Sequence, residues 1–534
     1  MSLMSGLSKT DIYTLKKINM ATPAEKLAEA LEVLKSFQEE GKIVILSEEI
    51  SRTTRERLVQ NGFLKEIIRG WYIPCPPDEK DGDTTSWYNS YWDFVVKYLN
   101  DRYDNLWCVS AEQSISLLSE NWTVPSQLIV RAPSGNNSNM TLAFDTAIFN
   151  LRTTLPSEGF LIERRGVRMY DLPTALINCS PSVFSHNPVD IYVALGMIRD
   201  ASEVLAPLLE GGHSVIAGRL AGAFRAIGRE RIATEILNTM QSAGYDVREN
   251  NPFEKEIALR LGRAIQSPYV SRIKMMWNNM RQDIINIFPP APGISPDHAS
   301  YLKAVEDIYV TDAYHSLSIE KYRVTPELIE KVRSGNWDIK KNEEDKNQRN
   351  AMAARGYYQA FQQVKESISK ILDGGNAGEI VDIDHSLWYR ELFGPSVAAG
   401  ILKASDLAGY RNHPVYIGGS KHVPLNTDAL RDAMPILFEL LMEESEASVR
   451  SVLGHFIFVF IHPYMDGNGR MGRFLMNVML ASGGYPWTVI PVEYRQEYMA
   501  ALENASVGLD IKPFAKFLAN LVLKALKGEQ VATI

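Results

Sequence analysis

Residues 461–473 read IHPYMDGNGRMGR. This stretch holds one titratable base, one carboxylate, one amide, three glycines and two arginines. The segments on either side, 446–460 and 474–481, are apolar with the spacing of buried helices. The sequence therefore predicts a polar loop between two buried helices, with the composition of a phosphate-binding site.

The glycines and arginines of this stretch suit a phosphate. Gly467 and Gly469 allow the backbone to approach a ligand where a Cβ would collide, and the N–H groups that open the second helix point at any anion placed there. Arg470 and Arg473 are three residues apart, so they occupy neighbouring positions on the first helical turn. Each can form paired hydrogen bonds with phosphate oxygens.

Two further side chains suit chemistry at a phosphate. Asp466 is a hard oxygen ligand that suits Mg²⁺, an ion that also holds substrate phosphates. His462 precedes the glycines, where a neutral imidazole can accept a proton from an incoming hydroxyl. The stretch therefore predicts a phosphate-transfer site.

The stretch resembles the signature of the Fic family, written HPFxDGNGRxGR, with Tyr464 in place of the usual Phe. The resemblance extends over about residues 298–528 and implies an all-α Fic fold with a β-hairpin flap. It also implies a protein adenylyltransferase, which transfers AMP from ATP to a Ser, Thr or Tyr hydroxyl of a target protein.

The family resemblance also implies roles for single residues. His462 would be the general base, and Asp466 would hold Mg²⁺. The residues implied to bind the nucleotide are Gly467, Asn468, Gly469, Arg470, Arg473 and Tyr498, the last near the adenine. ATP is therefore the expected co-substrate and Mg²⁺ the expected metal ion.

An upstream segment, SLSIEK at residues 316–321, resembles the inhibitory helix [S/T]xxxE[G/N] of many Fic proteins. The resemblance implies that Ser316 and Glu320 belong to this helix and that Glu320 pairs with Arg473, where it competes with the γ-phosphate of ATP. Lys321 departs from the pattern at a position where a residue with φ > 0 is expected, which Gly and Asn tolerate. The alternative is an exposed glutamate without a partner.

Residues 409–424 alternate briefly around Gly418-Gly419, which predicts a hairpin. The hairpin resembles the family's flap, which binds a target side chain by pairing with the target backbone. The flap residues would be Val415, Tyr416, Ile417 and Gly418.

The N-terminal region has the order of a winged helix-turn-helix. A helix over 24–40, a strand at 43–46, a short helix after Ser47, a third helix from Arg52 and a hairpin at 63–73 are predicted. Basic side chains on the third helix could contact DNA, namely Arg52, Arg55 and Arg57. The alternative is a protein-interaction module, because the fold is reused without DNA.

Phrases between about residues 20 and 260, including RGWYIP at 69–74, resemble the AbiEi-type antitoxin and regulator family. We therefore expect a multidomain chain. Its domains would be a winged helix at 20–90, an α+β regulator region at 91–260, a helix and proline-rich linker at 261–297, and the Fic domain at 298–528 with its inhibitory helix at 298–321.

Composition narrows the classes of function. The 534 residues carry 45% hydrophobic and 22% charged residues and a net charge of −8, which argues against a uniformly basic nucleic-acid binder. Three widely spaced cysteines without a CxxC pair suggest reduced thiols, so a cytoplasmic protein is expected. No apolar run is long enough for a membrane span.

Three alternatives stay open for function. The domain could remove AMP from a modified protein, or use another nucleotide donor. The chain could be a DNA-binding regulator whose Fic half is a sensor. A homodimer is also left open.

Overall fold

The computed structural model describes residues 22–79, 83–253, 267–334, 345–407 and 409–534. The chain divides into two compact units. The first takes in the described parts of Met1–Gln113, Val124–Tyr170 and Gly418–Ser420, and the second those of Ser114–Thr123, Asp171–Ile417 and Lys421–Ile534. Within these ranges, no helix combines the length and apolar character needed to cross a bilayer.

The first unit begins with a small helical and β region. Helix α2 (Pro23–Glu39) starts with a capping box, in which Thr22 and Glu25 each accept a hydrogen bond from the other's backbone N–H. The elements that follow are β1 (Ile45–Leu46), α3 (Arg52–Gln60), β2 (Leu64–Ile68) and β3 (Trp71–Pro74). The strands form an antiparallel sheet in the order β1-β3-β2.

The short helix predicted after Ser47 is wrong, because residues 47–49 form a turn. Two side chains form hydrogen bonds with backbone groups at this turn. Glu49 accepts from the N–H of Leu46, and Arg55 donates to the carbonyl of Ser47. The described residues therefore place two helices before the hairpin, where a winged helix-turn-helix has three.

The rest of the first unit combines a helix with short strands. Helix α4 (Thr85–Tyr103) is followed by β4 (Cys108–Val109), β5 (Gln127–Ala132), β6 (Ser138–Thr141), β7 (Ala147–Arg152), β8 (Leu161–Arg164) and β9 (Val167–Tyr170). Strands β4-β5-β7-β6 form one sheet in which β5 and β7 are parallel, and β8 pairs with β9. Helix α5 (Ala111–Leu118) begins in this unit and ends in the second.

The second unit opens with short helices and a long apolar one. The short helices are α6 (Leu172–Asn178), α7 (Val183–His186), α8 (Pro188–Met197), α9 (Ser202–Glu210), α10 (Ser214–Ala226) and α11 (Glu230–Ser242). Helix α12 (Pro268–Ile287) follows and packs against α8 and against three helices of the C-terminal half. Its methionine and tryptophan stripe is buried, as helical spacing predicts for a core.

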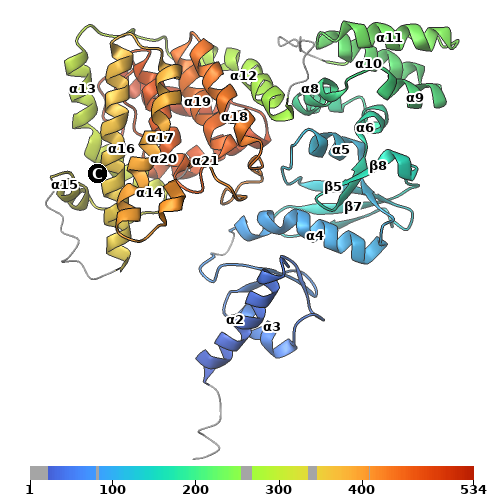
Figure 1. The fold of residues 1–534 in the computed structure, drawn as a ribbon, viewed down its shortest axis with the longest axis horizontal. Coiled ribbons are helices and arrows are strands. Elements are labelled where there is room, and N and C mark those ends of the chain that lie inside the picture. The colour runs from blue at the N-terminus through green and yellow to red at the C-terminus, as the bar shows by residue number, and fades with distance from the viewer. Residues whose placement is uncertain (1–21, 80–82, 254–266, 335–344, 408) are drawn as a thin grey trace, which may run out of the picture. The chain divides into compact units, whose positions relative to one another are not determined.

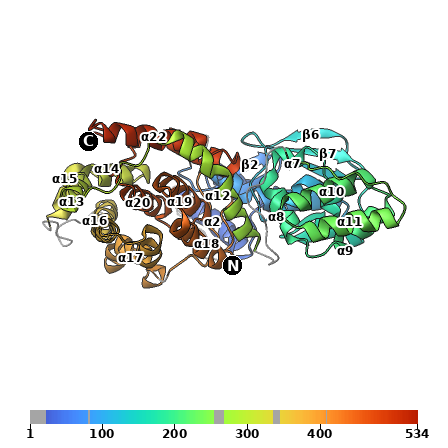
Figure 2. The ribbon, with the colours of Figure 1, turned by 90° about the horizontal axis from the view of Figure 1, so that it is seen from above.

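The C-terminal half is a helical bundle (Figure 1). Its helices are α13 (His298–Asp307), α14 (Tyr309–Ile319), α15 (Pro326–Arg333), α16 (Asp345–Leu372), α17 (Ala377–Ala398), α18 (Leu430–Glu443), α19 (Ala447–Ile461), α20 (Asn468–Ala481), α21 (Arg495–Val507) and α22 (Lys512–Leu526). Helices α19 and α20 pack on each other at its centre, next to α16 and α17 (Figure 2). The motif loop therefore joins two buried helices, as predicted.

Two sequence expectations for this half are wrong. The single helix expected over 298–318 is two helices, α13 and α14, separated at Ile308. Tyr309, the first residue of α14, is buried edge-on against Tyr358 and Phe361. The hairpin expected over 409–424 has a turn at Gly418-Gly419, but the described residues 409–424 contain no strand. Prolines at 414 and 424 remove N–H donors from both arms, which weakens a ladder.

A buried ion pair holds α8 and α12 together. Arg272 donates to the Asp190 carboxylate and to the carbonyl of Ser119, and Asp190 has no solvent exposure. Removing one partner of such a pair leaves an uncompensated buried charge.

We predict that Arg272→Leu lowers the unfolding free energy of the second unit by about 3–5 kcal/mol. Arg225→Leu is the matched control, because its ion pair with Glu249 is partly exposed and is worth about 1 kcal/mol or less. The measurement is chemical denaturation of both variants beside the wild type. Equal losses in the two variants would contradict a structural role for the buried pair.

Candidate functional site

The motif loop is shaped by two left-handed residues. His462 ends α19 at φ 55° and ψ 60°, and Gly467 precedes α20 at φ 83°. The left-handed conformation is costly for a side chain with a Cβ, so surrounding contacts must hold His462 in place.

An amide closes the loop from inside. Asn468 Nδ2 donates to the Tyr464 carbonyl at 2.8 Å, and Asn468 Oδ1 accepts from the Tyr464 N–H at 2.9 Å. The side chain is buried, so these two bonds occupy it within the loop. Any contact of Asn468 with a phosphate would therefore come from its backbone N–H.

Arg411 is a residue of the site that sequence reasoning missed. Its Nε donates to the carbonyl of His462 at 2.8 Å, and its own N–H donates to the carbonyl of Pro463 at 2.9 Å. Its other nitrogens donate to the carbonyls of His413 and Leu425. Arg411 thus holds the backbone at His462. In the sequence it is a lone arginine in a predicted loop, which does not indicate this role.

The His462 ring is oriented by the end of α19. Its Nδ1 lies 3.1 Å from the carbonyl of Val459, an acceptor, so Nδ1 carries the proton and Nε2 is free to accept one. Burial lowers the pKa of His462 to about 4. The imidazole is therefore neutral at physiological pH, the form that a general base requires.

The N-terminus of α20 carries a carboxylate. A Cβ built on Gly469 would lie 2.2 Å from Glu320 Oε1, so the Glu320 carboxylate rests directly on the glycine backbone. The first N–H groups of a helix have no intrahelical partner and carry partial positive charge. This end of α20 can hold an anion, and Glu320 takes that place.

Arg473 joins the same carboxylate to α14. Its Nη2 donates to Glu320 Oε1 at 2.8 Å and to the carbonyl of Ser316 at 3.0 Å, and its Nε donates to the Ser316 hydroxyl at 2.9 Å. Burial raises the pKa of Glu320, but the charges of Arg473 and Arg470 outweigh burial and hold that pKa below its ordinary value. Glu320 is therefore ionised at neutral pH.

The end of α14 forms a Schellman turn. The N–H of Lys321 donates to the carbonyl of Ser318, and the N–H of Tyr322 donates to the carbonyl of Leu317. Lys321 adopts φ 67°, the conformation that Gly or Asn would accept at lower cost. The turn orients Glu320 toward α20 although a lysine stands at its left-handed position.

Asp466 offers a single carboxylate, which suits a metal ion whose other ligands come from a substrate and water. Asp466 accepts from the N–H of Gly467 and lies 3.5 Å from Arg470 Nη2, and its carboxylate is exposed. Among the described residues, no three His, Cys, Asp or Glu side chains come together to hold a metal ion. A single carboxylate fits Mg²⁺, which keeps several waters and binds substrate phosphates.

Two further predicted features differ in how the structure holds them. Tyr498 is buried, with its hydroxyl 2.7 Å from His455 Nε2. The Arg473 charge opposes the rise that burial causes in the pKa of Tyr498, so this residue lies beside the cluster. The predicted flap residues 415–418 lie on an irregular segment without strand pairing.

The three arginines predicted to bind DNA make contacts within the N-terminal helical and β region. Arg52 pairs with Glu56 at 2.7 Å and is exposed. Arg55 donates to the carbonyl of Ser47, and Arg57 donates to that of Lys26. Two of the three therefore help to hold the small domain together, and DNA binding stays a prediction.

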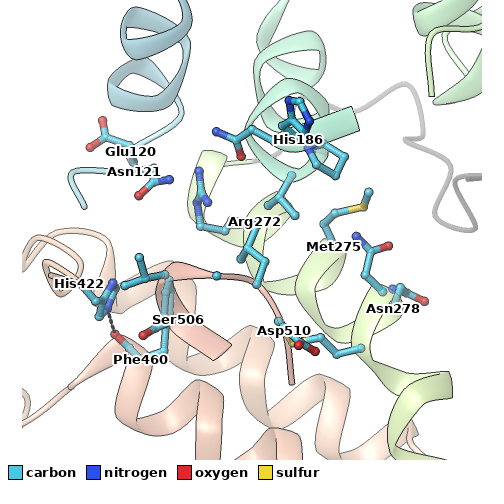
Figure 3. A pocket seen from close by; sticks show the side chains of 18 of the residues that line it. Glu120, Asn121, His186, Arg272, Met275, Asn278, His422, Phe460, Ser506 and Asp510 are labelled. Atoms are coloured by element: carbon cyan, nitrogen blue, oxygen red, sulfur yellow. Dashed lines mark hydrogen bonds between the residues drawn. The ribbon is translucent and has the colours of Figure 1, made fainter. Parts of the chain in front are cut away.

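A cavity of about 660 Å³ lies beside α12, outside the motif loop (Figure 3). Arg272, Asn278 and His422 are among its lining residues. None of the motif residues from His462 to Arg473 lines it. The cavity is therefore separate from the Glu320 and Arg473 cluster.

Residues 386–480 match the model of the Fic/DOC family. The protein adenylyltransferase Fic of Drosophila willistoni is 40% identical over 121 residues, which are 22% of this chain and 24% of that protein. The corresponding Drosophila mojavensis protein is 39% identical over the same length. The chain thus spans about a quarter of the length of these relatives.

Two solved structures that match part of this chain are described as Fic proteins. A Fic-1 fragment from C. elegans is 17% identical, with 64% of this chain and 86% of that chain covered and a TM-score of 0.35. A Fic domain containing signaling protein from Bacteroides thetaiotaomicron is 16% identical, with 50% and 99% covered and a TM-score of 0.34.

The family match falls on the two buried helices and the loop that carries His462, Asp466 and Arg473. The C-terminal region of this chain therefore contains a Fic/DOC domain.

Proposed function

We propose that the Fic/DOC domain is a protein adenylyltransferase that Glu320 holds in an inhibited state. The reaction would transfer AMP from ATP to a Ser, Thr or Tyr hydroxyl of a target protein. The Drosophila relatives that share 40% identity with this region are named protein adenylyltransferases, which supports this class of reaction.

The observation that carries the proposal is the position of the Glu320 carboxylate. It lies on Gly469 at the start of α20 and 2.8 Å from Arg473 Nη2. The positive end of a helix dipole and a buried guanidinium meet at this carboxylate, and such a pair also suits a phosphate group. A phosphate of ATP would need the same donors, so the carboxylate and the phosphate exclude each other.

The chemical step needs a base at the acceptor hydroxyl. In the proposed reaction the hydroxyl oxygen bonds to the α-phosphorus of ATP, the bond to the β-phosphate oxygen breaks, and pyrophosphate leaves. His462 Nε2 accepts the hydroxyl proton, because Nδ1 already donates to Val459. The low pKa of His462 keeps Nε2 unprotonated.

Charge on the phosphates would be balanced by the loop and α20. The N–H groups of Gly467, Asn468 and Gly469 line the loop, and the guanidinium groups of Arg470 and Arg473 stabilise negative charge on the departing pyrophosphate. When bound, Mg²⁺ would supply further neutralisation of the phosphate oxygens. Asp466 is the residue that would hold it.

One observation also favours the reverse reaction. The pKa of Glu320 lies below its ordinary value, so the carboxylate is ionised and can act as a base toward a water molecule. That water would displace AMP from a modified protein. Release of AMP from a modified target, lost in Glu320→Gly, would distinguish this reaction from transfer.

We predict that Glu320→Gly turns on labelling by α-labelled ATP and Mg²⁺, because Arg473 and the N-terminus of α20 become available to a phosphate. Label on the protein itself should rise at least about tenfold over wild type, the scale of one lost charged contact. Glu327→Gly is the control, since Glu327 is a fully exposed glutamate of α15. Equal labelling of the two variants would argue against inhibition by Glu320.

We further predict that His462→Ala, added to the Glu320→Gly protein, abolishes labelling. The dissociation constant for ATP should stay within about threefold, because a general base stabilises the transition state and not the bound substrate. Calorimetry with ATP and Mg²⁺ checks binding, and autoradiography checks transfer. His298→Ala is the control, since His298 is a partly exposed residue of α13. Labelling that survives in His462→Ala would remove His462 from the mechanism.

A further inference from the structure

The Arg470 guanidinium is held between two aromatic rings. Its Cζ lies 5.0 Å from the ring centroid of Tyr322 and 4.9 Å from that of Phe393. The side chain is 1% exposed. A planar guanidinium gains cation–π and stacking stabilisation from such neighbours, more so when it is desolvated.

Neighbouring core residues hold the Phe393 ring in place. A Cβ built on Gly467 would lie 2.7 Å from the Phe393 ring, so that ring packs against the motif loop. Behind it, Tyr389 lies 5.0 Å from Phe393 and stacks on Tyr464 at 3.8 Å. Phe393 therefore has little freedom to move.

The Tyr322 side comes from the inhibitory segment. Tyr322 is the second residue after Glu320, and the left-handed turn at Lys321 directs the chain there. A second arginine, Arg349 of α16, lies over the same Tyr322 ring at 5.7 Å. The turn that points Glu320 at Arg473 thus also places Tyr322 on Arg470.

The in-plane edge of Arg470 lacks hydrogen-bond partners. Its Nε and Nη2 are buried and form no hydrogen bond, and the Asp466 carboxylate is 3.5 Å away and exposed. Unpaired buried donors on a cation cost stability unless an anion completes them. Both rings lie against the guanidinium, so an anion would bind through the unpaired N–H groups.

We propose that Tyr322 is a positioning residue that holds the Arg470 guanidinium edge toward the phosphates of ATP beyond the α-phosphate. This role rests on the proposed adenylyltransferase function. It adds to that function a constraint on regulation: α14 must stay in place for Arg470 to stay oriented.

Other contacts also hold α14 in place. Arg473 is bonded to Ser316, Arg495 Nε donates to the carbonyl of Ile319 at 2.8 Å, and His315 accepts from the N–H of Val492. The Glu320 side chain, by contrast, keeps 28% of its surface exposed. On this proposal, inhibition would be relieved by movement of the Glu320 side chain while α14 and Tyr322 stay in place.

The test uses the full chain with Glu320→Gly as parent, with Tyr322→Ala and Tyr322→Phe added separately. Calorimetry measures the affinity for ATP with Mg²⁺ and for AMP. We expect Tyr322→Ala to weaken the affinity for ATP about tenfold and the affinity for AMP less than about twofold. Tyr322→Phe should change both affinities by less than about twofold, because Phe retains the ring. The ratio of ATP to AMP affinity within one variant is insensitive to partial misfolding.

A double-mutant cycle identifies the partner of Tyr322. In a protein that already carries Arg470→Ala, adding Tyr322→Ala should no longer change ATP affinity.

Two results would overturn the role of Tyr322. One is an equal loss of affinity for ATP and AMP, and the other is activation of labelling by Tyr322→Ala with Glu320 intact. If the Glu320→Gly parent binds no ATP, the proposed function itself fails, whereas an unchanged ratio in a parent that binds ATP contradicts only the positioning role.

Discussion

The ion pair between Glu320 and Arg473 is the contact on which the rest of the site depends. Two guanidinium groups, those of Arg470 and Arg473, are almost fully buried at the start of α20. Burying a charge without a partner is costly, so the site needs negative charge. Glu320 forms a hydrogen bond with Arg473, whereas the exposed Asp466 carboxylate lies 3.5 Å from Arg470 Nη2 without one. Arg470 therefore keeps buried N–H groups that a polyphosphate could satisfy.

Two residues in left-handed conformations set the directions of the chain around this pair. His462 turns the end of α19 into the loop, and Lys321 turns the end of α14 toward α16. Neither is a glycine, so each position depends on neighbouring contacts to offset the cost. Arg411 holds the first turn through the carbonyl of His462, and the second is closed by backbone hydrogen bonds to Leu317 and Ser318. Hydrogen bonds to the backbone thus hold the turns at His462, the proposed base, and beside Glu320, the proposed inhibitor.

The sequence allowed the loop between two buried helices to be predicted because apolar periodicity and a dense motif coincide at 461–473. A contact between Glu320 and Arg473 could be expected only through the family pattern, since 153 residues separate them. Arg411, Tyr322 and Phe393 could not be found, because their roles come from contacts between segments that are distant in the sequence. The hairpin at 409–424 was a local inference from alternation, and the described structure contains a turn without strands. Tyr498 was expected from a family position, and its place beside the adenine stays a prediction.

The most direct test of this account is a crystal structure of Glu320→Gly with ATP and Mg²⁺ beside wild type under the same conditions. The account predicts phosphate oxygens within hydrogen-bonding distance of Arg473 Nη2 in the variant, in the place that Glu320 Oε1 occupies in the wild type, with α14 unmoved. ATP bound to wild type with its phosphates on Arg473, while Glu320 keeps its ion pair, would contradict the claim that carboxylate and phosphate compete for one guanidinium.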